Sequence, residues 1–389
     1  MVRFFARLCT DLQHGQSTPT LRRLIPCHRV IYETSSMATR LLPEWYPQDA
    51  VQLTWPSPTS DWAPLLERIE ATLEAIVVAI ARYQPVLIAV PDESLRHELI
   101  QRFVRLGVEA SRLHLYSAEA DDTWTRDHGP IAVERNGAIA LLDYVFTGWG
   151  GKFEAQRDNR LTQCLAAAGA YACPVERRNI VLEGGAIESD GAGTLLTTEA
   201  CLLNPNRNPQ LDREALEALL AADFGIKRVL WLANGHLEGD DTDSHIDTLA
   251  RFCDPATIAY VRCDDESDPH YQALAAMEAE LKAFRRADGE PYRLIPLPWP
   301  QPCFDPEDGH RLPATYANFL IVNSAVLVPV YGDAADTRAL MALGEAFPGR
   351  DIVPIDCTSV IRQHGSLHCL TMQLPQGSLN TARQPGVSI

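Results

Sequence analysis

The sequence predicts an α/β fold: a five-bladed propeller with pseudo-fivefold symmetry, built from ββαβ modules. A phrase of two strands, an amphipathic helix and a third short strand recurs along the chain. Four copies are complete, and the parts of a fifth lie at the two ends, so pairing of the N- and C-terminal segments would close the ring. Closure would also remove exposed strand edges. Because the copies share negligible sequence identity, an unclosed α/β or α+β domain remains the alternative.

The four complete modules follow one another in the middle of the chain. Apolar runs bounded by turn residues indicate the strands, and apolar faces of helical period indicate the helices. In the order first strand, second strand, helix and third strand, the predicted modules are 131–134, 138–146, 154–168 and 174–177; 180–188, 194–203, 212–222 and 228–232; 245–252, 257–262, 270–286 and 292–297; and 316–323, 325–331, 334–347 and 351–356.

The fifth module is divided between the chain ends. Its first strand is the apolar run 367–374, after which the chain lacks a second strand and a helix. The missing parts match a strand at 51–55, a helix at 61–83 and a strand at 85–90. An additional helix at 92–106 and a strand at 114–117 lead to the first complete module.

Composition limits the class of partner. The 389 residues are 46% hydrophobic and 22% charged, with a net charge of −17, which disfavours nucleic acid and anionic membranes and suits a small cation. The ten cysteines show no Cys-x-x-Cys pair, which favours a reducing, cytoplasmic location. No apolar run is long enough to span a membrane. A homodimer is an open alternative to a monomer.

Residues 1–36 differ from the rest of the chain in composition. Five arginines stand against two acidic residues, without a clear strand or helix pattern. We expect these residues to be a disordered extension, or to be included only because the start codon is mis-assigned. A transit peptide is the alternative. Met37 begins a segment typical of a natural start, so we expect one domain over residues 37–389.

A polar or reactive residue stands at or near the first strand of each module: Asp127, Glu183, His245, Asn318 and Cys369. Equivalent positions in a closed ring converge on its axis, so we expect these side chains to meet in one central site. A thiol, an imidazole and carboxylates held together suit nucleophilic attack on a cation.

Cys369 is the candidate nucleophile, at the head of the strand 367–374. His368 would point to the opposite strand face and is therefore a poor base for this thiol. His245 is the better partner, because strand alternation would place Asp247 on its face. The alternative is an inert buried cysteine, which is the commoner kind.

Two further residues indicate a pocket. Trp124 precedes Arg126-Asp127 closely, and an aromatic wall beside a carboxylate favours cations and planar groups. Glu183 ends an apolar run before Gly184-Gly185, where the missing side chains permit a close approach. A surface ion pair of Arg126 with Asp127, followed by a turn, is the alternative.

The acidic run 239–243 before His245 allows a metal site as a competing hypothesis. It lacks the glycine and the distal glutamate of a calcium loop, and no zinc motif is present. We therefore favour a solvated turn and expect neither a metal nor an organic cofactor.

Ordered motifs over residues 40–375 resemble those of the agmatine deiminases. This family belongs, with the Porphyromonas-type peptidyl-arginine deiminases, to the guanidine-modifying pentein superfamily. The motifs are Trp124-Thr-Arg-Asp-His-Gly-Pro130, Leu182-Glu-Gly-Gly185, Asp190-Gly-Ala-Gly-Thr194, Leu196-Thr-Thr-Glu199, Cys201-Leu-Leu-Asn-Pro-Asn-Arg-Asn-Pro209, Asp241-Thr-Asp-Ser-His-Ile-Asp247, Tyr316-Ala-Asn-Phe319 and Leu367-His-Cys369.

The resemblance implies a five-bladed α/β propeller and a cofactor-free hydrolysis of agmatine to N-carbamoylputrescine and ammonia, a step of putrescine biosynthesis. It implies that Cys369 attacks the guanidinium carbon and forms a covalent thiouronium. Asp127 and Asp247 would bind the planar cation through paired contacts. His245 would protonate the leaving ammonia and then activate water, and Glu183 would bind the guanidinium and position His245.

Loop neighbours of these residues depart from the agmatine deiminase pattern. The family's Gly-Gly-Gly-Asn-Ile-His-Cys is replaced by Gln363-His364-Gly365-Ser366-Leu367-His368-Cys369, Asn-Gly-His-Val-Asp-Asn by 243–248, and Arg-Asp-Thr-Gly-Pro by 126–130. Agmatine stays the first choice of substrate, with peptidyl or free arginine as the alternative. An amidinotransferase and a catalytically inactive binding propeller are the rival classes.

Overall fold

The computed structural model describes residues 39–382, so the expected extension, residues 1–36, lies outside the described residues. The described strands form six separate sheets, none of which closes on itself. Five of the sheets contain the same three-strand unit: an antiparallel pair of strands, then a third strand parallel to the second. A parallel pair requires a crossover, and a helix supplies it each time.

The units share the order first strand, second strand, crossover helix and third strand. They are β5 (Ile131–Arg135), β6 (Ala138–Val145), α5 (Asp158–Ala167) and β7 (Val175–Val181); β8 (Glu188–Ser189), β9 (Thr194–Thr198), α7 (Arg213–Phe224) and β10 (Arg228–Leu232); β11 (Ala250–Asp254), β12 (Thr257–Val261), α8 (Tyr271–Ala283) and β13 (Arg293–Leu297); β16 (Leu320–Val322), β17 (Ala325–Val330), α9 (Asp336–Ala346) and β18 (Asp351–Asp356); and β19 (Thr371–Pro375), β2 (Gln48–Thr54), α1 (Leu66–Ala81) and β3 (Val86–Val90).

Additional elements extend these units. β1 (Thr39–Leu41) pairs with β5, and β4 (Leu113–Ser117) follows α2 (Glu93–Arg105) and pairs with β3. A two-stranded sheet joins β14 (Cys303–Phe304) to β15 (Arg311–Leu312). The short helices are α3 (Thr125–His128), α4 (Gly148–Gly151) and α6 (Glu199–Leu202), with the 3-10 helices η1 (Ala63–Leu65), η2 (Ala110–Arg112), η3 (Gly184–Ala186), η4 (Ile246–Thr248) and η5 (Val360–Gln363).

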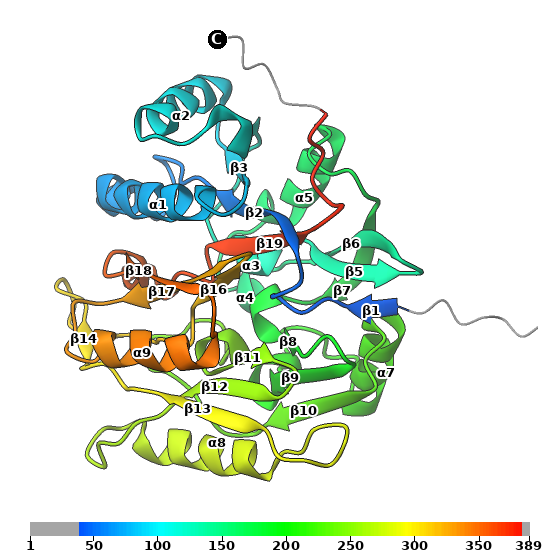
Figure 1. The fold of residues 1–389 in the computed structure, drawn as a ribbon, viewed down its shortest axis with the longest axis vertical. Helices are drawn as coiled ribbons and strands as arrows, with labels where there is room; N and C mark the ends of the chain where they lie inside the picture. The colour runs from blue at the N-terminus through cyan, green and yellow to red at the C-terminus, as the bar shows by residue number, and fades with distance from the viewer. Residues whose placement is uncertain (1–38, 383–389) are drawn as a thin grey trace, which may run out of the picture. The chain divides into compact units, whose positions relative to one another are not determined.

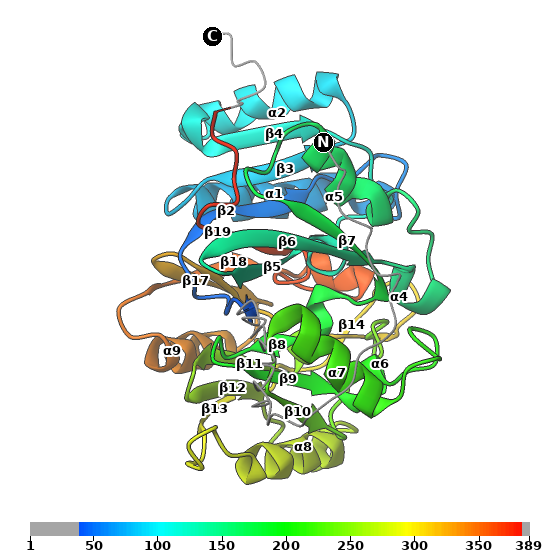
Figure 2. The same cartoon turned by 90° about the vertical axis from the view of Figure 1, so that its right-hand side faces the viewer.

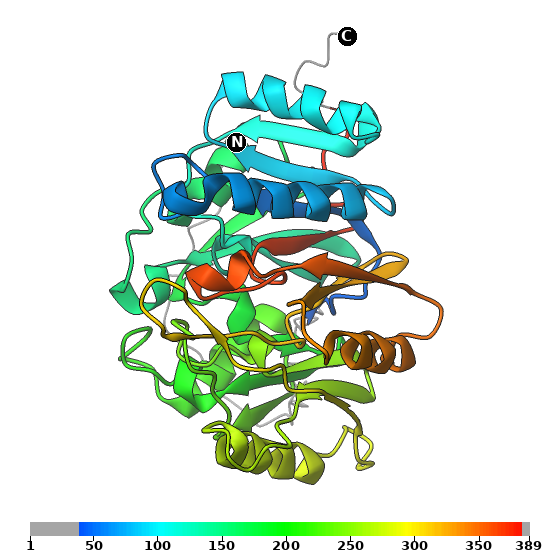
Figure 3. The same cartoon turned by 90° about the vertical axis from the view of Figure 1, so that its left-hand side faces the viewer.

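The long helices lie outside the strands of residues 39–382. In Figure 1, α1, α8 and α9 lie at the periphery, whereas the short α3 and α4 lie near the middle. Figure 2 shows α8 below β10 and β13 at the lower edge, and the opposite view in Figure 3 shows α1 in blue and α9 in orange.

The first and last parts of the described chain meet in one sheet. β19 pairs antiparallel with β2, with Thr371 opposite Leu53 and Leu374 opposite Ala50. Figure 1 shows the red β19 beside the blue β2. This pairing brings Cys369, just before β19, into the interior beside segments from the first half of the chain.

Local sequence accounts for the helix ends. Asp212 accepts a hydrogen bond from Ala215 N at 2.9 Å, as the predicted start of α7 requires, and Gly225 ends the helix with φ 68°. Asp92 starts α2 in the same way through Leu95 N. No helix within residues 39–382 is long and apolar enough to cross a membrane.

Three predicted first strands differ from the structure. Residues 180–188 divide between the end of β7, the 3-10 helix η3 and the short β8, because Gly184 and Gly185 permit a tight turn. His245 and Asp247 lie at η4, before β11 begins at Ala250. The strand-alternation argument for these two residues was therefore wrong. Cys369 likewise lies in a turn, and β19 begins at Thr371.

Candidate active site

The five predicted site residues occupy equivalent places, immediately before the first strand of each unit. Asp127 lies in α3 before β5, Glu183 precedes η3, His245 precedes η4, Asn318 lies before β16 and Cys369 before β19. All five are buried, with exposed fractions of 4% or less. Direct packing of α3 on η3 and of η3 on η4 brings the segments together.

Cys369 lies between Asn318 and Asp247. Its Sγ is 3.3 Å from Asn318 Nδ2 and 3.8 Å from Asp247 Oδ2, and its backbone N–H donates to Asn318 Oδ1 at 3.3 Å. Burial, together with the carboxylates of Asp247 and Asp127, raises the pKa of the Cys369 thiol well above its ordinary value. The unliganded site therefore holds a protonated thiol.

Asp247 presents one engaged and one open oxygen. Oδ2 accepts a hydrogen bond from His368 Nδ1 at 2.7 Å, whereas Oδ1 is buried and has no hydrogen-bond partner among the described residues. Burial acts to raise the pKa of Asp247, but His368 and His245 outweigh it and lower the pKa below its usual value. Asp247 is therefore an ionised acceptor with one oxygen available.

Asp127 is oriented by two donors. Gly185 N donates to Oδ1 and Trp149 Nε1 donates to Oδ2, both at 3.0 Å. Burial and the nearby carboxylates of Asp247 and Glu183 raise the pKa of Asp127 well above its ordinary value. An approaching cation would reverse this shift, because it favours the ionised carboxylate.

Glu183 is held by a buried arginine. Its Oε1 accepts from Arg207 Nε at 2.8 Å, and its Oε2 lies 4.0 Å from His245 Nε2 without a hydrogen bond within the described part of the chain. Burial raises the pKa of Glu183 in spite of Arg207. Arg207 also donates to the Thr242 carbonyl at 2.9 Å, so it links Glu183 to the segment before His245.

His245 is buried, and neither ring nitrogen has a hydrogen bond within residues 39–382, although Nδ1 lies 3.5 Å from Asp127 Oδ1. Burial lowers its pKa to about 3, so the ring is neutral near pH 7. The ring packs directly on glycine: a Cβ at Gly185 would lie 2.6 Å from His245 Nδ1 and 2.8 Å from Asp127 Oδ1. The glycine therefore allows the imidazole and the carboxylate to approach each other.

A pocket leads to Cys369 and Asp127. Its empty volume is about 430 Å³, and its walls include Trp124, Trp149 and Phe153. Four aspartates line it, Asp61, Asp122, Asp127 and Asp241, and no lysine or arginine does among the described residues. Trp124 Nε1 donates to Asp122 Oδ2 at 3.0 Å, which fixes the indole in the wall.

The Arg126–Asp127 surface pair considered from the sequence is not formed. Both side chains are buried and point to different partners: Arg126 Nη1 donates to Gln373 Oε1 at 2.6 Å. The acidic run is likewise engaged, since Asp240 accepts from Thr242 N and Ser244 N at 3.0 and 2.7 Å and Asp243 pairs with Lys152 and Arg207.

Sequence reasoning missed four residues that hold the site: Trp149, Arg207, Glu44 and His368. One signal existed in the sequence for Trp149, because glycines surround it. The structure shows its φ to be 54°, a strained value for an aromatic residue. Arg207 lies in the Asn/Pro-rich loop 204–209. Nothing in the local sequence distinguishes Glu44 from other charged residues.

Two groups of buried side chains place ligating atoms close together: Glu183, Cys201 and His245, and Glu44, Glu188 and His368. An arginine occupies each group, Arg207 on Glu183 and Arg251 on Glu44 and Glu188. A resident guanidinium opposes a second cation at the same carboxylates, so neither donor set fits a metal ion well.

The repeated strand–strand–helix–strand units and the buried cysteine among carboxylates define the class, an α/β protein with a cysteine-centred polar site. Residues 40–375 match the family Porphyromonas-type peptidyl-arginine deiminase, and the chain belongs to that family. It is 34% identical over 354 residues to the agmatine deiminase of Stutzerimonas stutzeri, covering 85% of this chain and 94% of that protein.

Solved structures of related proteins have a similar fold. The substrate-bound agmatine deiminase of C. jejuni superimposes with a TM-score of 0.80 at 37% identity, covering 87% of this chain and 97% of that one. A Porphyromonas gingivalis protein, assigned provisionally as an arginine deiminase, gives a TM-score of 0.81 at 48% identity, covering 88% of this chain and 100% of that one.

Proposed function

We propose that this protein is an agmatine deiminase, which hydrolyses the guanidinium of agmatine to N-carbamoylputrescine and ammonia in putrescine biosynthesis. One observation carries the proposal: an acidic pocket ends at a buried thiol beside Asp127 and Asp247. The agmatine deiminases of S. stutzeri and C. jejuni support it by their similarity. The enzyme is a cysteine-dependent hydrolase of a C–N bond in a linear amidine.

The pocket walls favour agmatine over free arginine. Agmatine carries an amine at the end of its chain, and Asp61, Asp122 and Asp241 offer it carboxylates. Free arginine also carries a carboxylate, which ionised Asp61 and Asp241 would repel, and none of the described lining residues is a lysine or arginine that would bind it. Peptidyl or free arginine remains the alternative substrate because of the Porphyromonas relative.

We assign substrate binding to groups that the unliganded site leaves open. Asp247 Oδ1 and Glu183 Oε2 are buried acceptors without partners among the described residues, and a planar guanidinium offers several N–H donors in fixed directions. Asp127 would bind the cation from its Trp149-oriented carboxylate. Trp124 would form an aromatic wall along the substrate.

The proposed chemistry begins with a neutral thiol and a neutral imidazole. The bound cation favours the thiolate, and His245 accepts the thiol proton. Sγ then attacks the guanidinium carbon, the C–N bond breaks, and the leaving ammonia takes the proton from His245, which leaves a covalent thiouronium on Cys369. Water attacks the same carbon while His245 accepts its proton, the C–S bond breaks, and the ureido product leaves. No step requires a metal or an organic cofactor.

The finer description of the fold is also a proposal. We propose that the five equivalent units form a five-bladed propeller around the site, closed by the β19–β2 pair, and that residues 37–389 are one domain. Five similar units, each with its site residue before the first strand, support this arrangement. We propose a cytoplasmic location, which the free thiols of the eight described cysteines support. Size-exclusion chromatography would decide between monomer and homodimer.

The decisive test follows ureido product from agmatine, free arginine and a peptidyl-arginine with purified protein. We expect agmatine to have the highest kcat/KM and Cys369→Ala to abolish turnover. Preference for either arginine substrate would overturn the specific function while leaving the mechanism intact. Turnover should persist in a strong chelator, and its loss would favour metal-dependent hydrolysis. Binding without turnover by the native protein would favour an inactive propeller.

A further inference from the structure

Asp247 is held from behind by a histidine that does not line the substrate pocket. The ring of His368 is buried between two carboxylates, with Nδ1 2.7 Å from Asp247 Oδ2 and Nε2 2.7 Å from Glu44 Oε2. His368 directly precedes Cys369, yet its ring points away from the thiol toward these acids. The ring is therefore placed to act on Asp247 and not as the base for Cys369.

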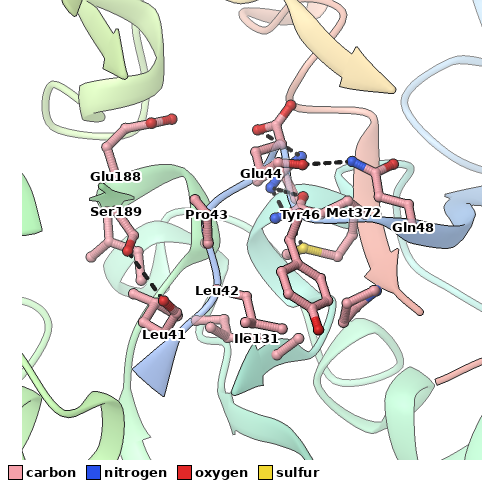
Figure 4. A pocket seen from close by; sticks show the side chains of 16 residues that line it. Leu41, Leu42, Pro43, Glu44, Tyr46, Gln48, Ile131, Glu188, Ser189 and Met372 are labelled. Atoms are coloured by element: carbon pink, nitrogen blue, oxygen red, sulfur yellow. Dashed lines mark hydrogen bonds and ion pairs between the residues drawn. The ribbon is translucent and has the colours of Figure 1, made fainter. Parts of the chain in front are cut away.

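Glu44 is itself fixed by several parts of the chain. Its Oε2 pairs with Arg251, which also binds Glu188, and its Oε1 accepts from Ile321 N at 2.7 Å. Figure 4 shows Glu44 on the wall of a second pocket, where Gln48 Nε2 donates a hydrogen bond to the Glu44 backbone carbonyl. A rigid, charged anchor thus lies on the side of His368 opposite the substrate.

The two contacts of His368 require two hydrogens. Ionised carboxylate oxygens only accept, so each 2.7 Å contact needs a proton between nitrogen and oxygen. Burial and then the guanidinium groups of Arg126 and Arg251 lower the pKa of His368, although Glu44 and Asp247 favour its protonated form. The pKa values of both carboxylates are lowered as well. The two 2.7 Å contacts, one to each carboxylate, fix the ring between Asp247 and Glu44.

We infer that His368 is a positioning residue: anchored by Glu44, it holds one oxygen of Asp247 and leaves the other free for the guanidinium of the substrate. This inference rests on the proposed function for the identity of the ligand. Two atoms define its geometry, since Asp247 Oδ2 is engaged by His368 and Oδ1 is a buried acceptor without a partner in residues 39–382. Free rotation of the carboxylate would present either oxygen and weaken the paired contact.

Two conservative variants separate positioning from general stabilisation. In His368→Asn the side-chain amide nitrogen lies near the place of Nδ1 and keeps a donor toward Asp247, but the contact with Glu44 is lost. In His368→Gln the amide nitrogen lies near the place of Nε2 and keeps the Glu44 contact, but Asp247 is released. Both variants lose the ring and one charge-assisted contact, so each is the control for the other.

The test measures agmatine binding by calorimetry in a Cys369→Ser background, where turnover is removed. Thermal unfolding of each variant defines the temperature range in which all are folded. We expect His368→Gln to lose about tenfold or more in affinity, and His368→Asn to lose much less, because only the former releases Asp247. In the Cys369 enzyme the same loss should appear in KM more than in kcat.

Each possible result of this test either supports or overturns the inference. Equal affinities in the two variants, whether retained or lost together, would overturn the inference and indicate a structural role. A larger loss in His368→Asn would also overturn it. If the native enzyme forms no ureido product but the serine background shows the expected difference, only the proposed function fails. If the serine background does not bind agmatine at all, both fail.

Discussion

At the residue scale, burial controls the protonation of the site before substrate arrives. It raises the pKa values of Cys369, Asp127 and Glu183 and lowers that of His245 to about 3. Few side chains of the site are therefore charged. Asp247 is one of them, because its hydrogen bond with His368 lowers its pKa. A cationic ligand would favour ionisation of the thiol and carboxylates together, which couples binding to activation of the nucleophile.

Gly185 is packed directly between the imidazole of His245 and the carboxylate of Asp127. We expect Gly185→Ala to reduce kcat/KM by about a hundredfold or more, because its Cβ would displace the imidazole and Asp127 from their positions. Gly344→Ala is the matched control: it lies in α9, where a Cβ would meet its nearest atom at 3.9 Å. We expect that change to leave turnover unaltered and to stabilise the fold slightly. Steady-state kinetics with both variants would contradict the prediction if Gly185→Ala retained activity.

At the element scale, helix starts and short turns place the site residues. The first residue of α5, Asp158, accepts hydrogen bonds from Asp121 N at 2.8 Å and Asp122 N at 3.2 Å. Asp122 in turn accepts from Trp62 Nε1 and Trp124 Nε1 at the pocket. A buried carboxyl at one helix start thereby supports an aromatic wall of the site.

The same carboxyl gives a pH-dependent stability. Burial raises the pKa of Asp158 to about 8, against about 3.9 in the unfolded chain. Between these values the unfolded state is ionised and the folded state is protonated, so Asp158 makes stability fall as pH rises. We expect Asp158→Asn, which keeps an accepting oxygen, to gain stability relative to the native protein between pH 5 and pH 8. Urea unfolding at both pH values measures this.

A second helix-start substitution provides the control for that experiment. Asp212→Asn changes the N-cap of α7, where Asp and Asn cap a helix about equally well. We expect this variant to follow the native protein at both pH values. A gain for Asp158→Asn that is the same at pH 5 and pH 8 would show that the carboxyl does not titrate as described.

At the scale of the whole molecule, the chain ends are joined by packing as well as by the β19–β2 pair. Leu374 of β19 is fully buried in a cluster that includes Ala50, Leu87, Leu141 and Leu161. These residues come from β2, β3, β6 and α5. Leu374 therefore contributes to a core that its own unit, β19 with β2 and β3, shares with the unit of β5, β6 and β7.

Removing this contact should destabilise the described domain as a unit. We expect Leu374→Ala to lower the free energy of unfolding by about 2–5 kcal/mol, the usual cost of a buried Leu→Ala cavity. The control is Leu106→Ala, because Leu106 is 48% exposed and should cost under about 0.5 kcal/mol. Denaturant unfolding measures both. Equal losses would mean that β19 packs independently of the core.

The order of strands and helices was largely predictable, because alternating apolar patterns and capping residues act over a few neighbours. The start of α7 at Asp212 and the limits of β10 and β18 agree with the pattern. The misplaced first strands share a cause. Gly184-Gly185 and the segment after His245 form 3-10 turns, whose apolar residues face a core supplied by other units, so an apolar run there does not indicate a strand.

The site shows the same division. The residue types at Asp127, Glu183, His245, Asp247 and Cys369 were identifiable from motifs within single segments. Their hydrogen bonds were not, because the partners are distant in the chain: His368 and Glu44 are 324 residues apart, and Arg207 and Glu183 are 24 apart. Protonation states depend on burial and on these long-range contacts together. Local sequence patterns thus determine the strands, the helices and the reactive residues. Packing between units determines the geometry of these residues and their protonation.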